Sequence, residues 1–137
     1  AKRVNLILQD VKKDIEATIS RNERTLVLNV DIGADSKASQ QVLNAVKKIG
    51  PGIAFMGLSE EERGSGGKLL AFAVVPESLV ESGLKADEWV RRTLEVCGGR
   101  GGGKPGNAQG QAPNCSDINA VMVVSKSFAE GQVSIEA

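Results

Sequence analysis

A glycine-rich tract between residues 98 and 111 constrains the folding of this chain more than any other segment. Six of the nine residues from 98 to 106 are glycine, and the same stretch carries Arg100 and Lys104. Ordering a glycine costs roughly 0.5–1 kcal/mol more than ordering an alanine, so fixing this tract costs about 3–6 kcal/mol. A whole domain is stable by only roughly 5–15 kcal/mol. We therefore expect packing, a helix cap or a ligand to offset the cost.

The composition of the tract favours an ordered loop that faces an anion over a flexible linker. No serine lies between Gly98 and Gln111, and Lys104 and Asn107-Ala108-Gln109 place specific polar groups within it. Bare glycine N–H groups form concave nests for anions, and neighbouring cations add charge. The spacing fits neither a P-loop nor a dinucleotide-binding turn, because no Gly-Lys-Ser/Thr opens a helix and no predicted strand directly precedes the tract.

Charge and aromatic content limit the kind of anion that we expect. The chain has 17 basic and 17 acidic residues, so its overall field does not attract polyanions. Between residues 91 and 104, four basic residues stand against one acidic residue, which gives a local net charge of +3. With three Phe, one Trp and no Tyr, the chain is poorly suited to stacking several bases on a sheet. We therefore expect the chain to contact phosphates through this positive patch and not to recognise a base sequence.

The side chains that most often carry catalysis or hold metals are scarce. Histidine is absent, and the two cysteines, Cys97 and Cys115, lack the CxxC spacing of a zinc site. Cys97 is expected at the end of a helix, where the helix dipole disfavours a thiolate. We predict no catalytic residue, no metal site and no cofactor in this chain. No signal peptide or long apolar run is evident, so we expect a soluble, cytoplasmic chain without a membrane partner.

The first half of the chain alternates helices and strands. Residues 2–19 form an amphipathic helix, whose apolar face is Val4, Leu8, Val11 and Ile15. That face either packs on its own domain or forms an interface with a partner, and two heptads do not decide between these. Strands are expected at 25–32, 53–58 and 68–75, with an exposed loop over 60–67. A helix capped by Asp35 or Ser36 and stopped by Gly50-Pro51-Gly52 is expected between the first two strands. Strand, helix and strand predict a βαβ unit, and the last two strands predict a hairpin.

The second half adds two helices on either side of the glycine tract. Residues 84–97 are expected to form a helix with Trp89 in the core, and Asn114 is a candidate cap for a helix through residues 118–128. By composition, residues 120–124 also suit a strand. The fold class is therefore α/β (α+β), a small mixed sheet of three or more strands with helices packed on it, preceded by the N-terminal helix. Residues 1–22 are assigned to the end of a helical linker and 23–137 to a globular glycine-rich domain.

The tract Gly-Gly-Arg-Gly-Gly-Gly-Lys-Pro-Gly-Asn-Ala-Gln, after a helix that ends in Val-Cys, resembles the glycine-rich C-terminal domain of alanyl-tRNA synthetases. That domain is related to the terminal domain of DHH-type phosphoesterases. Ala1-Lys2-Arg3-Val4, Lys37-Ala38 and Leu84–Val90 look like the cytoplasmic animal enzymes. Lys104 replaces the arginine usual in bacterial members, and Gly106 replaces an acidic residue. Since lysine is a point charge, phosphate contacts should be looser than those of a bidentate arginine.

The resemblance implies a non-catalytic appendage that binds the outer corner of tRNA(Ala) and brings the aminoacylation and editing domains onto one tRNA. The parent enzyme would use ATP, magnesium and zinc to attach alanine and would edit mischarged tRNA. An alternative is a repurposed interaction module that forms a homodimer or binds duplex DNA. The candidate nucleic-acid-binding residues are Arg91, Arg92, Gly98, Gly99, Arg100, Gly101, Gly102, Gly103, Lys104 and Gln109.

Overall fold

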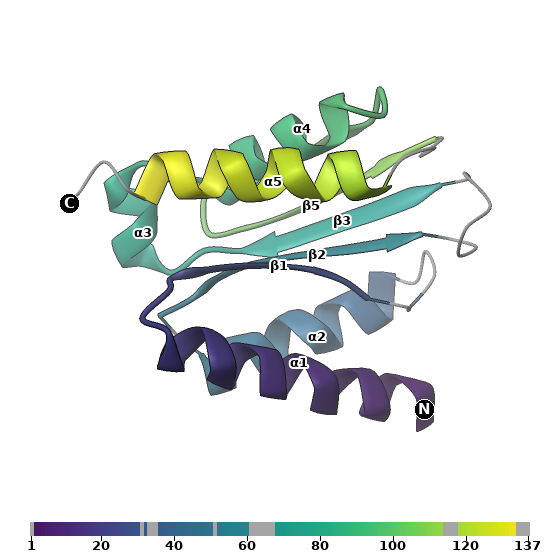
Figure 1. The fold of residues 1–137 in the computed structure, drawn as a ribbon. Helices are drawn as coiled ribbons and strands as arrows, with labels where there is room; N and C mark the ends of the chain where they lie inside the picture. Colours follow the sequence, from purple (N-terminus) through teal and green to yellow (C-terminus); the bar gives the residue numbers. More distant parts are fainter. Residues whose placement is uncertain are drawn as a thin grey trace.

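The computed structural model describes residues 2–30, 32, 36–50, 52–60, 68–113 and 118–133. In these ranges, five strands form one mixed sheet between two layers of helices (Figure 1). The elements are α1 (Lys2–Ser20), β1 (Thr25–Asn29), α2 (Ser36–Ile49), β2 (Ala54–Glu60), β3 (Leu69–Val74), α3 (Glu77–Ser82), α4 (Ala86–Glu95), β4 (Arg100–Lys104), β5 (Asn107–Ala112) and α5 (Ile118–Val133).

The strand order across the sheet is β1-β2-β3-β5-β4. β1 and β2 are parallel, as expected for two strands joined through a helix, and every other neighbouring pair is antiparallel. The predicted α/β fold class and the β2–β3 hairpin are confirmed. The hairpin's connection, residues 61–67, lies outside the described residues. β1 ends at Asn29, earlier than predicted, and β2 continues to Glu60, where the sequence suggested a loop.

Helices cover both faces of the sheet, which is why β2 and β3 read as continuous apolar runs. α1 and α2 pack on one face, over β1, β2 and β3, whereas α4 and α5 pack on the other (Figure 1). The side chains of β3 alternate between the two layers, as strand geometry requires. Leu70, Phe72 and Val74 belong to the core under α1 and α2, and the intervening residues belong to the core under α4 and α5.

The predicted apolar face of α1 packs largely within the domain. Val11 and Ile15 are buried in the core formed with α2, and Leu8 packs against that core while partly exposed. The side chain of Val4 lies outside the described residues. The division of the chain between residues 22 and 23 stays a prediction.

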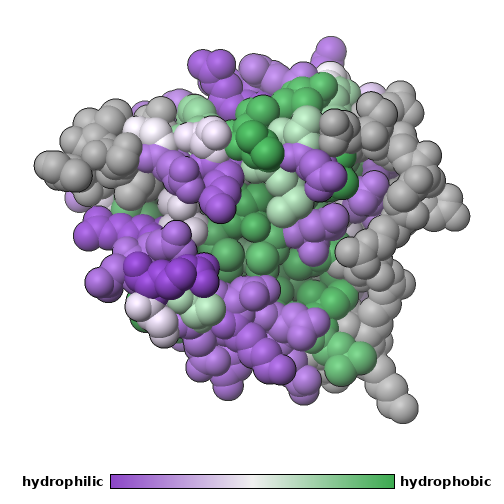
Figure 2. Space-filling view, viewed as in Figure 1, coloured by the Kyte–Doolittle hydropathy of each residue, from purple (hydrophilic) through white to green (hydrophobic). Residues whose placement is uncertain are grey.

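β1 forms one of the two edges of the sheet, and all five of its residues are half-buried. Figure 2 shows this side of the molecule, with hydrophobic side chains gathered between the two helix layers. Leu26 and Leu28 of β1 pack against the core beneath α1, and Val27 packs against the opposite core. The edge opposite β1 is β4, at the far side of the sheet.

Trp89 connects α4 to α5. Its side chain is fully buried, and its indole Nε1–H donates a hydrogen bond of 2.8 Å to the backbone oxygen of Ser125. The predicted core position of Trp89 is confirmed. Residues 118–133 form a helix, so the strand alternative for residues 120–124 is wrong; the candidate cap Asn114 lies outside the described residues. The short helix α3 was not predicted, since six residues carry too little periodicity to detect.

Replacing Trp89 with Phe should lower the free energy of unfolding by about 1–3 kcal/mol, because it leaves the buried Ser125 carbonyl without its indole donor and removes ring volume. Urea unfolding followed by circular dichroism measures this change. Fluorescence is unsuitable because Trp89 is the only tryptophan in the chain. An unchanged midpoint and slope would show that the α4–α5 contact does not depend on this bond.

Candidate nucleic-acid interface

The glycine tract is a β-hairpin and not a loop, so that prediction was wrong. β4 and β5 are antiparallel and are joined by Pro105-Gly106, and β5 also pairs with β3. Strand preference comes largely from side chains that pack on a pleated surface, and glycine provides none. The local sequence of β4 therefore gave no strand signal. Pairing with β3 and packing beneath α4 produce the strands instead.

The glycines allow α4 to lie directly on the backbone of the hairpin. A Cβ atom placed on Gly101 would come within 2.5 Å of Val90 Cγ1. One placed on Gly110 would lie 2.4 Å from the Arg100 carbonyl oxygen and 2.8 Å from Leu94 Cδ1. Such approaches leave no room for a side chain. Burial of Val90 and Leu94 against these strands is one contribution that offsets the cost of ordering glycine.

The start of the hairpin caps α4. Gly98 is left-handed, with φ 68°, and its N–H donates to the Glu95 oxygen at 3.2 Å. The Gly99 N–H donates to the Leu94 oxygen at 2.8 Å. Together these bonds are a Schellman motif, which satisfies carbonyls at a helix end. The N–H groups of Gly98 and Gly99, predicted to face an anion, are thus engaged within the fold.

The turn of the hairpin is also held by backbone hydrogen bonds. The Pro105 oxygen accepts from the Ala86 N–H at 2.7 Å, at the first residue of α4. The Gly106 oxygen accepts from the Val75 N–H at 3.0 Å, just beyond β3. The start of the glycine tract and its central turn are therefore both held by hydrogen bonds within the fold.

The other side of the hairpin is open, and it is polar. On β4, Arg100, Gly102 and Lys104 alternate with the glycines that face α4, and all three are exposed. A Cβ atom on Gly102 would meet no atom of the described residues within 4 Å, so none of the described elements covers this side at Gly102. On β5 the side chains opposite them are amides. We call these six residues the open face: Arg100, Gly102, Lys104, Asn107, Gln109 and Gln111.

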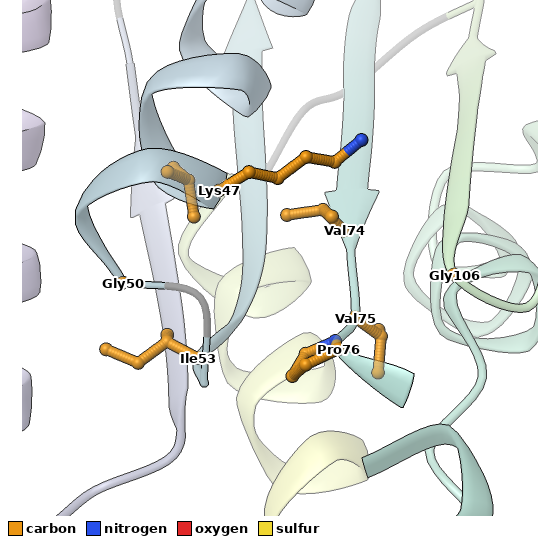
Figure 3. A pocket seen from close by; sticks show the side chains of 8 residues that line it. Lys47, Gly50, Ile53, Val74, Val75, Pro76 and Gly106 are labelled. Carbon is orange, nitrogen blue, oxygen red and sulfur yellow. The ribbon is translucent and has the colours of Figure 1, made fainter. Parts of the chain in front are cut away.

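The strand register aligns the open face with the end of the α2 layer. Val74 of β3 pairs with Asn107 of β5, which pairs with Lys104 of β4, so these three side chains form one row across the sheet. Val74 lies beneath α2, whereas Asn107 is only half-buried and Lys104 is exposed. The helix layer thus stops at β3, and the open face begins beside it. Lys47 of α2 extends over Val74 at this border (Figure 3).

The open face combines cations with hydrogen-bonding groups. None of the described acidic side chains forms an ion pair with Arg100, Lys104 or Lys47. The amides of Asn107, Gln109 and Gln111 donate and accept hydrogen bonds. Because β4 is an edge strand, every second residue also directs its backbone N–H away from the sheet. This chemistry suits phosphate oxygens and ribose hydroxyls.

The structure does not bring all the predicted binding residues together. Arg100, Gly102, Lys104 and Gln109 share the open face. Arg91 and Arg92 are exposed on α4, which packs on the opposite face of the sheet. Arg92 also lies 4.0 Å from the Glu95 carboxylate.

Three polar residues at this site are not among the predicted binding residues: Lys47, Asn107 and Gln111. Two of them had a detectable signal. Amides at 107, 109 and 111 alternate with Ala108, Gly110 and Ala112, which is the period-two pattern of a half-buried strand. Lys47 had no such sequence signal, because only the tertiary fold places α2 beside the hairpin.

Within the described ranges, no group of three or more His, Cys, Asp or Glu side chains is placed to hold a metal ion. A search of the same ranges finds no helix with the length and apolar character needed to span a membrane.

The chain is an α/β domain, because its mixed sheet has helices on both faces. The glycine hairpin beneath α4 forms one edge of that sheet, and this edge is polar. The chain belongs to the DHHA1 domain family, whose model matches residues 22–134. It is similar to cytoplasmic alanine–tRNA ligases: that of Bombyx mori is 30% identical over 98% of this chain, and that of Caenorhabditis elegans is 38% identical over 82%. These matches span only 14% and 11% of the relatives' own lengths.

A solved structure has the same fold. The C-Ala domain from Aquifex aeolicus alanyl-tRNA synthetase matches with a TM-score of 0.58 at 15% identity, over 81% of this chain and 89% of that one. At this identity the likeness concerns the fold alone.

Replacing Gly110 with Ala should lower the free energy of unfolding by about 1–3 kcal/mol, because the added methyl group would collide with β4 and with Leu94. Replacing Gly102 with Ala adds the same methyl group to the open side. That variant should be neutral or stabilised by up to about 1 kcal/mol. Urea titrations of both variants measure the difference, and equal losses would contradict the packing of α4 on the hairpin.

Proposed function

We propose that this chain is the C-terminal domain of an alanyl-tRNA synthetase and that its open face binds the phosphate backbone of tRNA(Ala). Three findings support the identity: the DHHA1 family match, the similarity to cytoplasmic alanine–tRNA ligases, and the fold shared with a C-Ala domain. The binding role rests on one observation of this chain. Cations and amides line the uncovered side of a hairpin whose other side is packed under α4.

The chemistry of the open face favours contacts to backbone over contacts to base edges. Lys104 and Arg100 attract phosphates, and the Arg100 guanidinium offers a bidentate fork. The amide column between β4 and the α2 layer supplies hydrogen bonds to phosphate or ribose. Gly102 leaves the centre of the face flat, so a nucleic-acid strand can approach the sheet closely. No aromatic side chain is present on the open face to stack bases.

In the whole enzyme, we propose that this domain contacts the outer corner of tRNA(Ala) while upstream domains perform aminoacylation and editing. The parent chain would require ATP, magnesium and zinc, bound outside this segment, and would act in the cytoplasm. This chain spans only about a tenth to a seventh of its curated relatives. Its own contribution is binding and positioning of the tRNA.

The test is a titration of the 137-residue chain with tRNA(Ala) at several salt concentrations. Replacing Arg100 and Lys104 with Ala should weaken binding and reduce the slope of log K against log salt by about 1.4–1.8, since two phosphate contacts are lost. A tRNA with a disrupted outer corner should bind the unaltered chain more weakly.

Arg91 and Arg92 provide the matched control. Their double replacement with Ala removes the same charge from the opposite helix layer, so the salt slope should change much less. If both double variants have the same effect, the domain attracts tRNA only through its general charge. If the hairpin variant binds tRNA normally, the open face is not the site.

A further inference from the structure

A pocket of about 240 Å³ lies at the border between the α2 layer and the hairpin. Its lining comes from the end of α2, the start of β2, the end of β3 and the turn between β4 and β5 (Figure 3). The walls are mainly aliphatic, and Lys47 is the one charged residue among the described lining. The lining residues are Val46, Lys47, Gly50, Ile53, Val74, Val75, Pro76 and Gly106.

The pocket borders the open face. Val74, which lines it, is in register with Asn107 and then with Lys104. Neighbouring strands lie about 4.8 Å apart, so Lys104 is roughly 10 Å from Val74 across the sheet. Lys47 extends over Val74 on the other side (Figure 3). An apolar pocket thus lies between Lys47 and Lys104, and the Asn107 amide stands between Val74 and Lys104 in the register.

We infer that this pocket receives one unstacked nucleobase of the RNA whose phosphates contact Lys47 and Lys104. The inference rests on the proposed function and adds a base-binding subsite to it. A nucleotide has the matching chemistry, since its base has apolar faces and its adjoining phosphate is an anion. Aliphatic side chains hold extruded bases by covering these faces. Among the described lining residues there is no carboxylate to repel the phosphate.

The size of the pocket limits the occupant to a single ring system. Pockets for drug-sized ligands are typically about 300–1,000 Å³. Since the described lining has no aromatic side chain, the pocket covers the faces of one base with aliphatic groups rather than stacking several, and it does not discriminate strongly by sequence.

The test compares two fluorescently labelled RNA octamers of equal charge, one with bases and one abasic throughout, by anisotropy with the 137-residue chain. The base-bearing octamer should bind about tenfold more tightly, in line with the enclosure of one base. Lys47→Met keeps the apolar stem of the side chain and removes the charge, and Val74→Phe fills the pocket. Val74→Phe should remove most of the tenfold preference, whereas Lys47→Met should weaken binding of both octamers.

Lys48→Met is the matched control, because Lys48 also lies in the last turn of α2 but does not line the pocket. It should bind both octamers nearly as the unaltered chain does. Circular dichroism checks the fold of Val74→Phe, and if that variant is unfolded, the comparison of Lys47→Met with Lys48→Met still decides whether the pocket border is used. Equal effects of the two lysine variants would overturn the inference.

The outcomes separate the pocket from the proposed function. If both octamers bind equally to the unaltered chain, or if tRNA(Ala) binds and neither octamer does, the pocket accepts no base while the backbone-binding role stands. If tRNA(Ala) also fails to bind, the proposed function and the pocket fail together.

Discussion

The contact between α4 and the bare backbone of β4 and β5 is the interaction on which the rest of the structure depends. Val90 and Leu94 approach so closely that a methyl group on Gly101 or Gly110 would collide with its neighbours. This contact covers one face of the hairpin, and Trp89 on the same helix joins α4 to α5. One helix therefore packs on the last two strands of the sheet and also joins them to the second helix of that layer.

Because α4 covers one face of the hairpin, only the opposite face is available for the proposed binding of nucleic acid. A strand directs alternate side chains to opposite sides, so the glycines that meet α4 force Arg100, Gly102 and Lys104 to the other side. The amides of β5 follow the same alternation. α2 covers the sheet only as far as β3. The open face and the pocket that Lys47 lines meet at that border. One face of β4 and β5 thus packs against α4, and the opposite face of the same two strands is the proposed binding surface.

Much of the architecture could be predicted from periodicity. The amphipathic spacing of α1, the apolar run of β3 and the stripe of α4 each reflect burial that local sequence records. The hairpin could not be predicted in this way, since Arg-Gly-Gly-Gly-Lys has no side-chain pattern of a strand. Its partner in the ladder, Asn107–Ala112, did alternate amides with small residues, and that signal was masked by the glycines around it.

The sequence by itself determined the chemistry of this protein: two cations in a glycine tract, no histidine, and no net charge over the whole chain. It also indicated the resemblance to alanyl-tRNA synthetases, because the order of glycine, lysine and proline in the tract is a local property. Only the tertiary structure decided which cations lie together. It placed Arg91 and Arg92 on α4, and Arg100 and Lys104 on the open face at the opposite side of the sheet. It also brought Lys47 of α2 to the hairpin from far along the chain. The physical reason is that strand pairing and helix packing join distant residues, and no local pattern encodes those contacts.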